Sequence, residues 1–250
     1  MTDSAPPIRP SPIRPTDDEA RKQARVLLRG AVHVALGVID PETGGPFVSR
    51  VALGTMPDGT VILLVSRLSA HTKAMLADAR VSLLAGEPGK GDPLAHPRLT
   101  VQCLAKPVET DSPLHEAMRS RFLARHPKSK LYIDFPDFLF FELTPQRAAL
   151  NGGFGRAFLL SGSDLMIRKR LAFPNGKTEA QTIQDLGYAL TAIVKNPPHI
   201  KGVKRDGKVQ ICGLDAAGID FFWGNSLIRS EFDVELDRLE LPNLPNPNKG

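Results

Sequence analysis

The sequence predicts a mainly antiparallel α+β protein: a split β-barrel with helices packed on its outside, followed by a small C-terminal α/β module. Short strand-like segments follow one another between residues 31 and 160, and turn signals such as Pro57-Asp58-Gly59 join them as hairpins. Helical segments are too few for a parallel sheet, which needs a crossover helix after nearly every strand. Beyond Ser161 the periodicity weakens, which indicates a second module.

The composition is that of a soluble globular protein, with 250 residues, 42% of them hydrophobic and 24% charged. No apolar run reaches the length of about 18 residues that suggests a membrane span, so we expect no membrane partner. Cys103 and Cys212 lie far apart in apolar segments and the N-terminus lacks a signal pattern, so we expect a cytoplasmic protein. The net charge of +5 favours anionic partners in general.

The N-terminal part is predicted to begin as a disordered tail over residues 1–15, because this stretch is Pro-rich and has no periodicity. A helix is expected from Asp17 to Arg29, with Thr16 and Glu19 at capping-box spacing and Gly30 as its C-terminal cap. Its exposed side should carry Arg21, Lys22, Arg25 and Arg29. From Ala31 the period changes to two, which predicts a strand with Val32, Val34, Leu36 and Val38 on its core face.

The remaining strands of the barrel are expected at 47–53, 60–66, 80–85, 99–106, 138–143, 148–150 and 157–160. A helix over 112–125 should lie outside the barrel, capped by Ser112, with Leu114, Ala117, Met118 and Phe122 on its apolar side. The basic residues of this region are interpreted as a solvated face; they are Arg119, Arg121, Arg125, Lys128 and Lys130. A nucleic-acid surface is the alternative, but no nucleic-acid motif accompanies them.

The C-terminal part divides into a small, partly degenerate module over 162–240 and a disordered tail over 241–250. Residues 162–208 are basic and weakly periodic, whereas 209–214 and 218–235 are strand-like around the turn 215–218. The split-barrel domain itself is predicted to span residues 16–161.

The segment from Ser66 to Lys73 is the strongest candidate for a binding site. It follows a hydrophobic strand and begins a short helix, so backbone N–H groups and the helix dipole face an incoming anion there. Ser66, Ser69, His71 and Thr72 add side-chain donors, which together predict a phosphate cradle. A hydrophilic turn with an N-cap serine is the alternative.

Residues 20–160 resemble the FMN-binding split-barrel superfamily of pyridoxamine-phosphate-oxidase-like proteins, and within it the HugZ-type heme-utilisation branch. The segments that carry the resemblance are 46–51 (PFVSRV), 66–73 (SRLSAHTK), 80–84 (RVSLL), 97–102 (PRLTVQ), 132–138 (YIDFPDF) and 151–157 (NGGFGRA). The resemblance implies a homodimer whose cofactor sites lie between the subunits.

For FMN, the resemblance assigns Ser49, Arg50 and Val51 to the strand along the flavin, and Gln102 to a position beside its rings. It assigns Ser66, Ser69, His71 and Thr72 to the turn that holds the phosphate. The oxidases carry an Arg-Lys pair after the serine of this turn, where this chain has Ala70 and His71. Because histidine can be neutral near pH 7, this departure predicts weaker phosphate binding.

For heme, the resemblance assigns Arg156 to the arginine placed over the porphyrin, and it implies an axial histidine downstream of that loop. His199 is the only histidine in the downstream region, which makes it the heme-iron candidate. Residues 164–205 and 240–250 do not resemble the branch, and either a divergent insert or a shifted reading frame would explain this.

These features lead to one predicted function and its alternatives. The first is an FMN-binding, pyridoxamine-phosphate-oxidase-like oxidoreductase. The second is a heme-binding or heme-degrading protein of iron utilisation, and the third is a catalytically silent dimeric binding module. A nucleic-acid-associated protein is the least favoured class.

Overall fold

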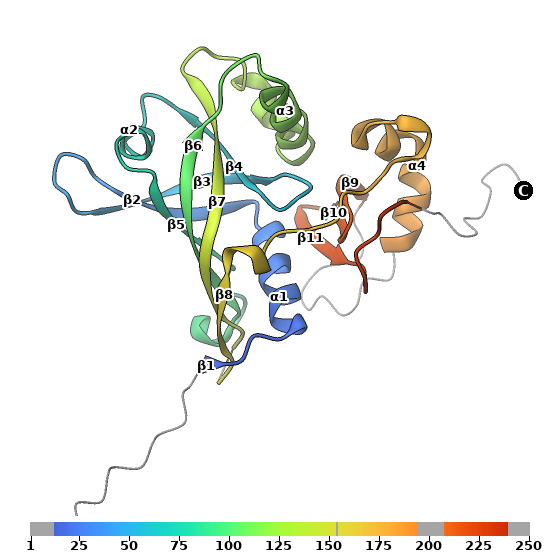
Figure 1. Cartoon of the computed structure of the whole chain (residues 1–250), viewed down its shortest axis with the longest axis horizontal. Helices are drawn as coiled ribbons and strands as arrows, with labels where there is room; N and C mark the ends of the chain where they lie inside the picture. The colour runs from blue at the N-terminus through green and yellow to red at the C-terminus, as the bar shows by residue number, and fades with distance from the viewer. Residues whose placement is uncertain (1–12, 154, 195–207, 240–250) are drawn as a thin grey trace, which may run out of the picture.

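The computed structural model describes residues 13–153, 155–194 and 208–239. Most of the predicted N-terminal tail, His199 and the predicted tail 241–250 lie outside the described residues. The main body is a closed antiparallel barrel in the strand order β4-β3-β2-β5-β6-β7, in which β7 pairs again with β4 (Figure 1). Its strands are β2 (His33–Ile39), β3 (Pro46–Thr55), β4 (Val61–Ser66), β5 (Arg80–Ala85), β6 (Arg98–Pro107) and β7 (Phe138–Asn151). The predicted fold class is confirmed.

The barrel closes because β7 is one long strand and not the two strands expected from the sequence. Its first part, from Phe138 to Leu143, pairs with β4, and its last part pairs with β8 (Ala157–Ser161). A register shift at Gln102/Cys103 in the β6–β7 ladder lets the strand bend between these partners. A short strand β1 (Ile13–Arg14) runs parallel to β8, so the end of the predicted tail is ordered.

The barrel interior is filled by side chains, as the alternating pattern predicts. Val34, Leu36 and Val38 of β2 are at most 3% exposed, and they belong to one continuous core with Leu63, Phe141 and the other inward residues of the barrel. Cys103 is part of this core. Because the interior is packed, a large planar ligand has to bind on the outside of the barrel.

Three helices cover the barrel: α1 (Asp18–Arg29), α2 (Ala70–Ala77) and α3 (Pro113–Arg125). Asp17 is the N-cap of α1, because its side chain accepts a hydrogen bond of 2.7 Å from the Ala20 N–H. Thr16 instead donates to the Leu159 carbonyl, so the predicted capping box is wrong by one residue. Ser112 caps α3 as expected, but Leu114 is 40% exposed and not on its packed side.

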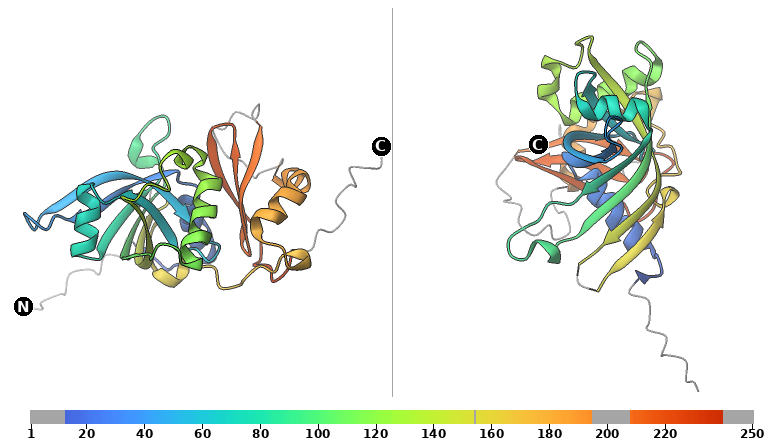
Figure 2. Two further views of the ribbon diagram at one scale, coloured as in Figure 1. Left: turned by 90° about the horizontal axis from the view of Figure 1, so that it is seen from above. Right: turned by 90° about the vertical axis from the view of Figure 1, so that its left-hand side faces the viewer.

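The C-terminal module is a three-stranded antiparallel sheet, β9 (Val209–Asp215), β10 (Gly218–Trp223) and β11 (Ser226–Glu231), with helix α4 (Glu179–Val194). Figure 2 shows α4 on the side of this sheet away from the barrel and α3 on the side toward it. The sheet is therefore sandwiched, since α4 packs on β9 while α3 and α1 contact β9 and β11 from the barrel side. The module has its own apolar core around Leu190, Ile219 and Phe221.

Buried charges join the module to the barrel. Arg29 and Arg121, predicted to be exposed on their helices, are 1% and 7% exposed, and Arg125 is 5% exposed. These arginines are buried, and not exposed as expected, because the second module covers the sides of α1 and α3 that the barrel leaves open. We define the arginine–carboxylate cluster by the side chains that meet at this junction: Arg29, Arg121, Arg125, Arg229, Asp215, Asp220 and Glu179.

The contacts of the cluster cross the junction in both directions. Arg29 Nη2 lies 2.5 Å from Asp215 Oδ2, and Arg229 Nη2 binds the other oxygen of Asp215 at 2.7 Å. Arg121 binds Glu179 and lies 3.3 Å from Asp220 Oδ2. A Cβ at Gly213 would lie 2.8 Å from the same Asp220 oxygen, so a larger residue there would displace this ion pair.

Burial alone would raise the pKa values of Asp215 and Asp220, but Arg29 and Arg229 outweigh it and hold both pKa values below their ordinary range. Both carboxylates are therefore charged at neutral pH. Burial also lowers the pKa of Arg125 to about 10, still well above pH 7. Asp215, Asp220 and Arg125 are thus charged at pH 7, and removing one member of the cluster leaves the charges that it contacts buried with fewer counter-charges.

We predict that Arg121→Met lowers the free energy of unfolding by about 3–5 kcal/mol, because it leaves Glu179 without its arginine partner and removes one of the three arginines that contact Asp220. Arg119→Met is the matched control, since Arg119 lies on the same helix but pairs with the exposed Asp134. Urea denaturation followed by the fluorescence of Trp223, the chain's single tryptophan, measures both variants. Equal midpoints for the two variants would contradict the assigned role of the cluster.

The cluster also predicts the pH dependence of stability. Because the pKa values of Asp215 and Asp220 are lower in the folded than in the unfolded chain, their contribution is complete above the unfolded value of about 3.9 and is lost as the pH falls below it. The free energy of unfolding should therefore fall steeply below about pH 4. Asp220→Asn should flatten that fall, whereas Glu42→Gln in an exposed turn should not. If the free energies of unfolding of Asp220→Asn and Glu42→Gln coincide between pH 2 and 5, the acid dependence does not come from the cluster.

Candidate functional site

The turn between β4 and α2 is closed by a carboxylate from a distant segment. Ser66 Oγ donates to Asp137 Oδ2 at 2.6 Å and accepts from the Leu68 N–H at 3.1 Å. The Arg67 N–H donates to the Asp137 carbonyl at 2.7 Å. Three donors of the turn, the Ser66 hydroxyl and the N–H groups of Arg67 and Leu68, are therefore already used, and the Asp137 carboxylate lies beside them.

The other cradle residues are brought to the same end of the barrel. Ser49 faces inward and its Oγ lies 3.2 Å from His71 Nδ1. Burial lowers the pKa of His71, so this imidazole is neutral near pH 7. Ser69 is the N-cap of α2 without a side-chain bond, and Thr72 is fully buried with no hydrogen-bond partner for its Oγ1 among the described residues.

This donor set is mixed with respect to an FMN phosphate. A phosphate near pH 7 carries a charge of about −1.5 to −2 and needs charge-assisted donors. Here the turn offers the Ser69 hydroxyl, a neutral His71 and the exposed cationic side chains of Arg67 and Lys73, whereas Asp137 adds repulsion. The FMN phosphate at this turn stays a prediction.

The strand β3 separates the residues that the resemblance placed along a flavin. Val51 is 7% exposed and points into the core with Ser49, whereas Arg50 points to the outer face of the barrel. Gln102 lies on the same outer face, on β6, where its Oε1 accepts from Arg147 Nε at 2.5 Å.

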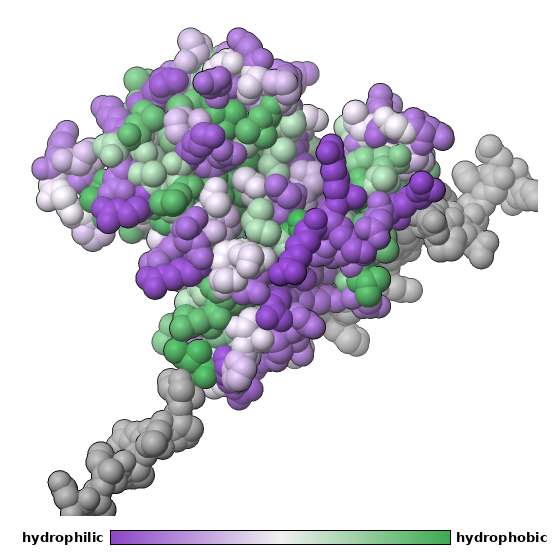
Figure 3. Space-filling view, viewed as in Figure 1, coloured by the Kyte–Doolittle hydropathy of each residue, from purple (hydrophilic) through white to green (hydrophobic). Residues whose placement is uncertain are grey.

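The outer face of the barrel strands carries apolar side chains among these polar ones. Arg50 on β3 pairs with Ala35 on β2, and the same row continues through Leu84, Thr100, Ala149 and Leu159. Leu84 is 45% exposed and Leu159 60% exposed, and Val48 reaches 66%. Figure 3 views the side of β6, β7 and β8 and shows hydrophobic residues among hydrophilic ones on it. We define this surface as the outer sheet face.

Arg156 lies apart from the outer sheet face. It follows the loop after β7, and its guanidinium lies 3.2 Å from Glu19 Oε1 on α1. Its nearest described partner is thus an exposed carboxylate, and the structure does not bring it together with Arg50 or Gln102 in one copy of the chain.

A groove that the sequence did not predict lies between α1, the first residues of β2, and β11 of the C-terminal module. Its volume is about 750 Å³, within the usual range for ligand pockets of about 300–1,000 Å³. We call it the α1–β11 groove. His33 lines it, with its Nδ1 3.5 Å from Glu87 Oε1, and Lys22 of α1 lines it as well.

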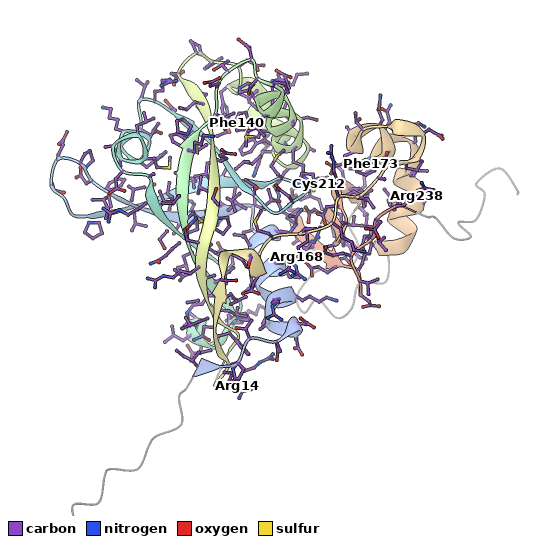
Figure 4. All side chains as sticks on the ribbon, in the orientation of Figure 1. Arg14, Phe140, Arg168, Phe173, Cys212 and Arg238 are labelled. Atoms are coloured by element: carbon purple, nitrogen blue, oxygen red, sulfur yellow. The ribbon has the colours of Figure 1, made fainter. Side chains whose placement is uncertain are left out.

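Other groups give no further site. In the described ranges, no three His, Cys, Asp or Glu side chains gather as a metal site, and no helix is long and apolar enough to cross a membrane. Cys212 is buried on β9 between the two modules (Figure 4), and burial raises its pKa to about 12, so it is not a reactive thiolate.

The barrel, the helices that cover it and the C-terminal module together define a split-barrel protein. The chain belongs to the family described as "CREG, beta-barrel", whose model matches residues 15–164. It is 33% identical over 142 residues to the non-canonical heme oxygenase HOZ of Arabidopsis thaliana, covering 56% of this chain but 43% of that protein. Over 160 residues it is 27% identical to the heme oxygenase HutZ of Vibrio cholerae, covering 62% and 84% of the two chains.

A solved structure extends the similarity to both modules. The heme-binding protein from Mycobacterium smegmatis is 26% identical, with a TM-score of 0.54 over 92% of this chain and 91% of that one. The predicted relationship to the HugZ-type branch is confirmed by these relatives. Because the match covers 92% of this chain, it extends beyond the barrel into the C-terminal module.

We predict that Asp137→Asn tightens FMN binding about tenfold, because it removes the negative charge beside the phosphate position. Asp134→Asn is the matched control, since Asp134 pairs with Arg119 and not with the cradle. The double variant Ser69→Ala/His71→Ala should lower the affinity for FMN. Quenching of flavin fluorescence measures all three, and an unchanged affinity in the Asp137 variant would show that the phosphate does not bind at this turn.

Proposed function

We propose that this chain is a heme-binding protein of the HugZ type, and that it binds heme on the outside of its barrel as a homodimer. The observation that carries the proposal is the outer sheet face, which combines exposed leucines with the cationic Arg50 and Arg147. Heme is a flat apolar molecule with carboxylates on one edge, so it needs both kinds of surface. The heme-related relatives support this choice over FMN.

The residues of the outer sheet face supply complementary contacts. Arg50 is exposed, so its guanidinium can pair with a propionate in two parallel hydrogen bonds. Small residues beside it, Ala35 and Gly37 on β2, leave room for a flat ligand to approach the sheet. Bound heme would supply the iron for oxygen chemistry, and the protein's part would be to orient it and tune its surroundings.

A second copy of the chain is part of this proposal. Val48, Leu84 and Leu159 expose large apolar areas on one face of the sheet, which is unusual for a monomer. A two-fold partner would cover this face and could bring its own Arg156 toward the first copy. Sedimentation equilibrium at micromolar concentration tests this part directly.

FMN remains the second candidate function. The turn at Ser69 still presents backbone donors at the start of α2, and this observation keeps a weak anion site open there. Titration with FMN and with hemin separates the two ligands, because each has its own absorption spectrum.

We predict that hemin titration of the purified protein gives a saturable Soret band, and that Arg50→Ala weakens binding about five- to tenfold through loss of a propionate contact. Arg168→Ala is the control, since Arg168 is an exposed arginine of the segment that follows the barrel (Figure 4). Absence of a saturable Soret band in the wild-type protein would refute the proposed function.

A further inference from the structure

We propose that His33 is the iron ligand for heme in this chain, and that the porphyrin edge enters the α1–β11 groove. This inference rests on the proposed function and adds the site to it. The observation behind it is a groove of about 750 Å³ that has one accessible imidazole on its wall.

The position of His33 suits an iron ligand. Its side chain is 41% exposed at the start of β2, and Glu87 lies 3.5 Å from Nδ1. No described residue hydrogen-bonds to its Nε2. A carboxylate near one ring nitrogen is a common arrangement around metal-binding histidines, and it leaves Nε2 as the nitrogen available to a metal.

The other described histidines are engaged elsewhere. His71 Nδ1 contacts Ser49, His126 Nε2 contacts the Leu53 carbonyl, and His96 Nε2 contacts the Lys90 carbonyl. His115 stacks edge-on against Phe140 and is largely buried. Among the described histidines, His33 is therefore the one that combines exposure with a cavity.

The groove has the chemistry that a porphyrin needs. Its walls are mainly apolar, contributed by Val26 and Leu27 of α1 and by Leu227 and Ile228 of β11. Lys22 adds an ammonium group for a propionate. Arg229 also lines the groove but is held by Asp215 and Asp220, so it supports the wall and does not bind the ligand.

The groove and the outer sheet face share strand β2, because His33 lines the groove and Ala35 lies in the row of the outer sheet face. His33 and Ala35 lie on the same side of β2, about 7 Å apart along the strand, and Ala35 pairs with Arg50. In this proposal His33 would hold the iron, and Arg50 is a cation near enough along the sheet to serve a propionate. A single heme accounts for both features.

Hemin titration of the full-length protein and of His33→Ala tests the inference by absorption and resonance Raman spectra. Wild type should give a histidine-ligated spectrum. His33→Ala should bind hemin more than about tenfold more weakly and lose that spectrum, and added imidazole should restore it by filling the vacated space. Circular dichroism confirms that the variant is folded, and His33→Gln repeats the test with a side chain of similar size.

His96→Ala and His199→Ala are the controls, and both should keep the histidine-ligated spectrum. Glu87→Gln should keep binding but lower the iron–histidine stretching frequency, which a purely structural role would not change. If wild type binds hemin and His33→Ala keeps the spectrum while His199→Ala loses it, the inference is wrong and the proposed function stands. If wild type binds no hemin, the proposed function fails first.

Discussion

The ionic contact between Arg29 of α1 and Asp215 of β9, within the arginine–carboxylate cluster, determines how the two modules are arranged. It is reinforced by a bidentate pair between Arg25 and Glu231, which holds β11 beside α1. Each of these charges is stabilised only while its partner is in place, so the cluster holds the module in one position and does not act as a loose hinge. The cluster therefore fixes the C-terminal sheet against the barrel helices.

The α1–β11 groove exists because of that arrangement. One wall comes from a helix near the N-terminus, another from a strand some 200 residues later, and the floor comes from the first barrel strand. A barrel without the C-terminal module would leave His33 on an open surface. The module's role in this account is thus to complete a binding site that the barrel only begins.

The barrel could be predicted from the sequence because its strands alternate cleanly between core and surface. Val34, Leu36 and Val38 are a clear example, and the hairpin at Gly59, with its positive φ, is another. Helix α4 was missed, although Ile183, Leu186 and Leu190 have helical spacing, because the polar residues among them weakened the pattern. β7 was divided in two because Pro145 resembles a strand end.

The site was harder to predict, for physical reasons. Arg121 and Arg29 looked solvated, since a charge on a helix is usually exposed and nothing local shows that a distant sheet covers it. Asp137 closes the cradle from 71 residues away, so the donors of Ser66 looked free. His33 alternates with the core residues of its strand, but the groove beside it is formed by tertiary packing that no local pattern records.

Hydrogen exchange measured by mass spectrometry, with and without hemin, shows whether one ligand contacts both walls of the groove. We expect added protection in peptides covering residues 22–35 and 225–231 together, because both walls would be covered by the same ligand. Added protection confined to residues 66–72, with none in the groove peptides, would contradict this expectation.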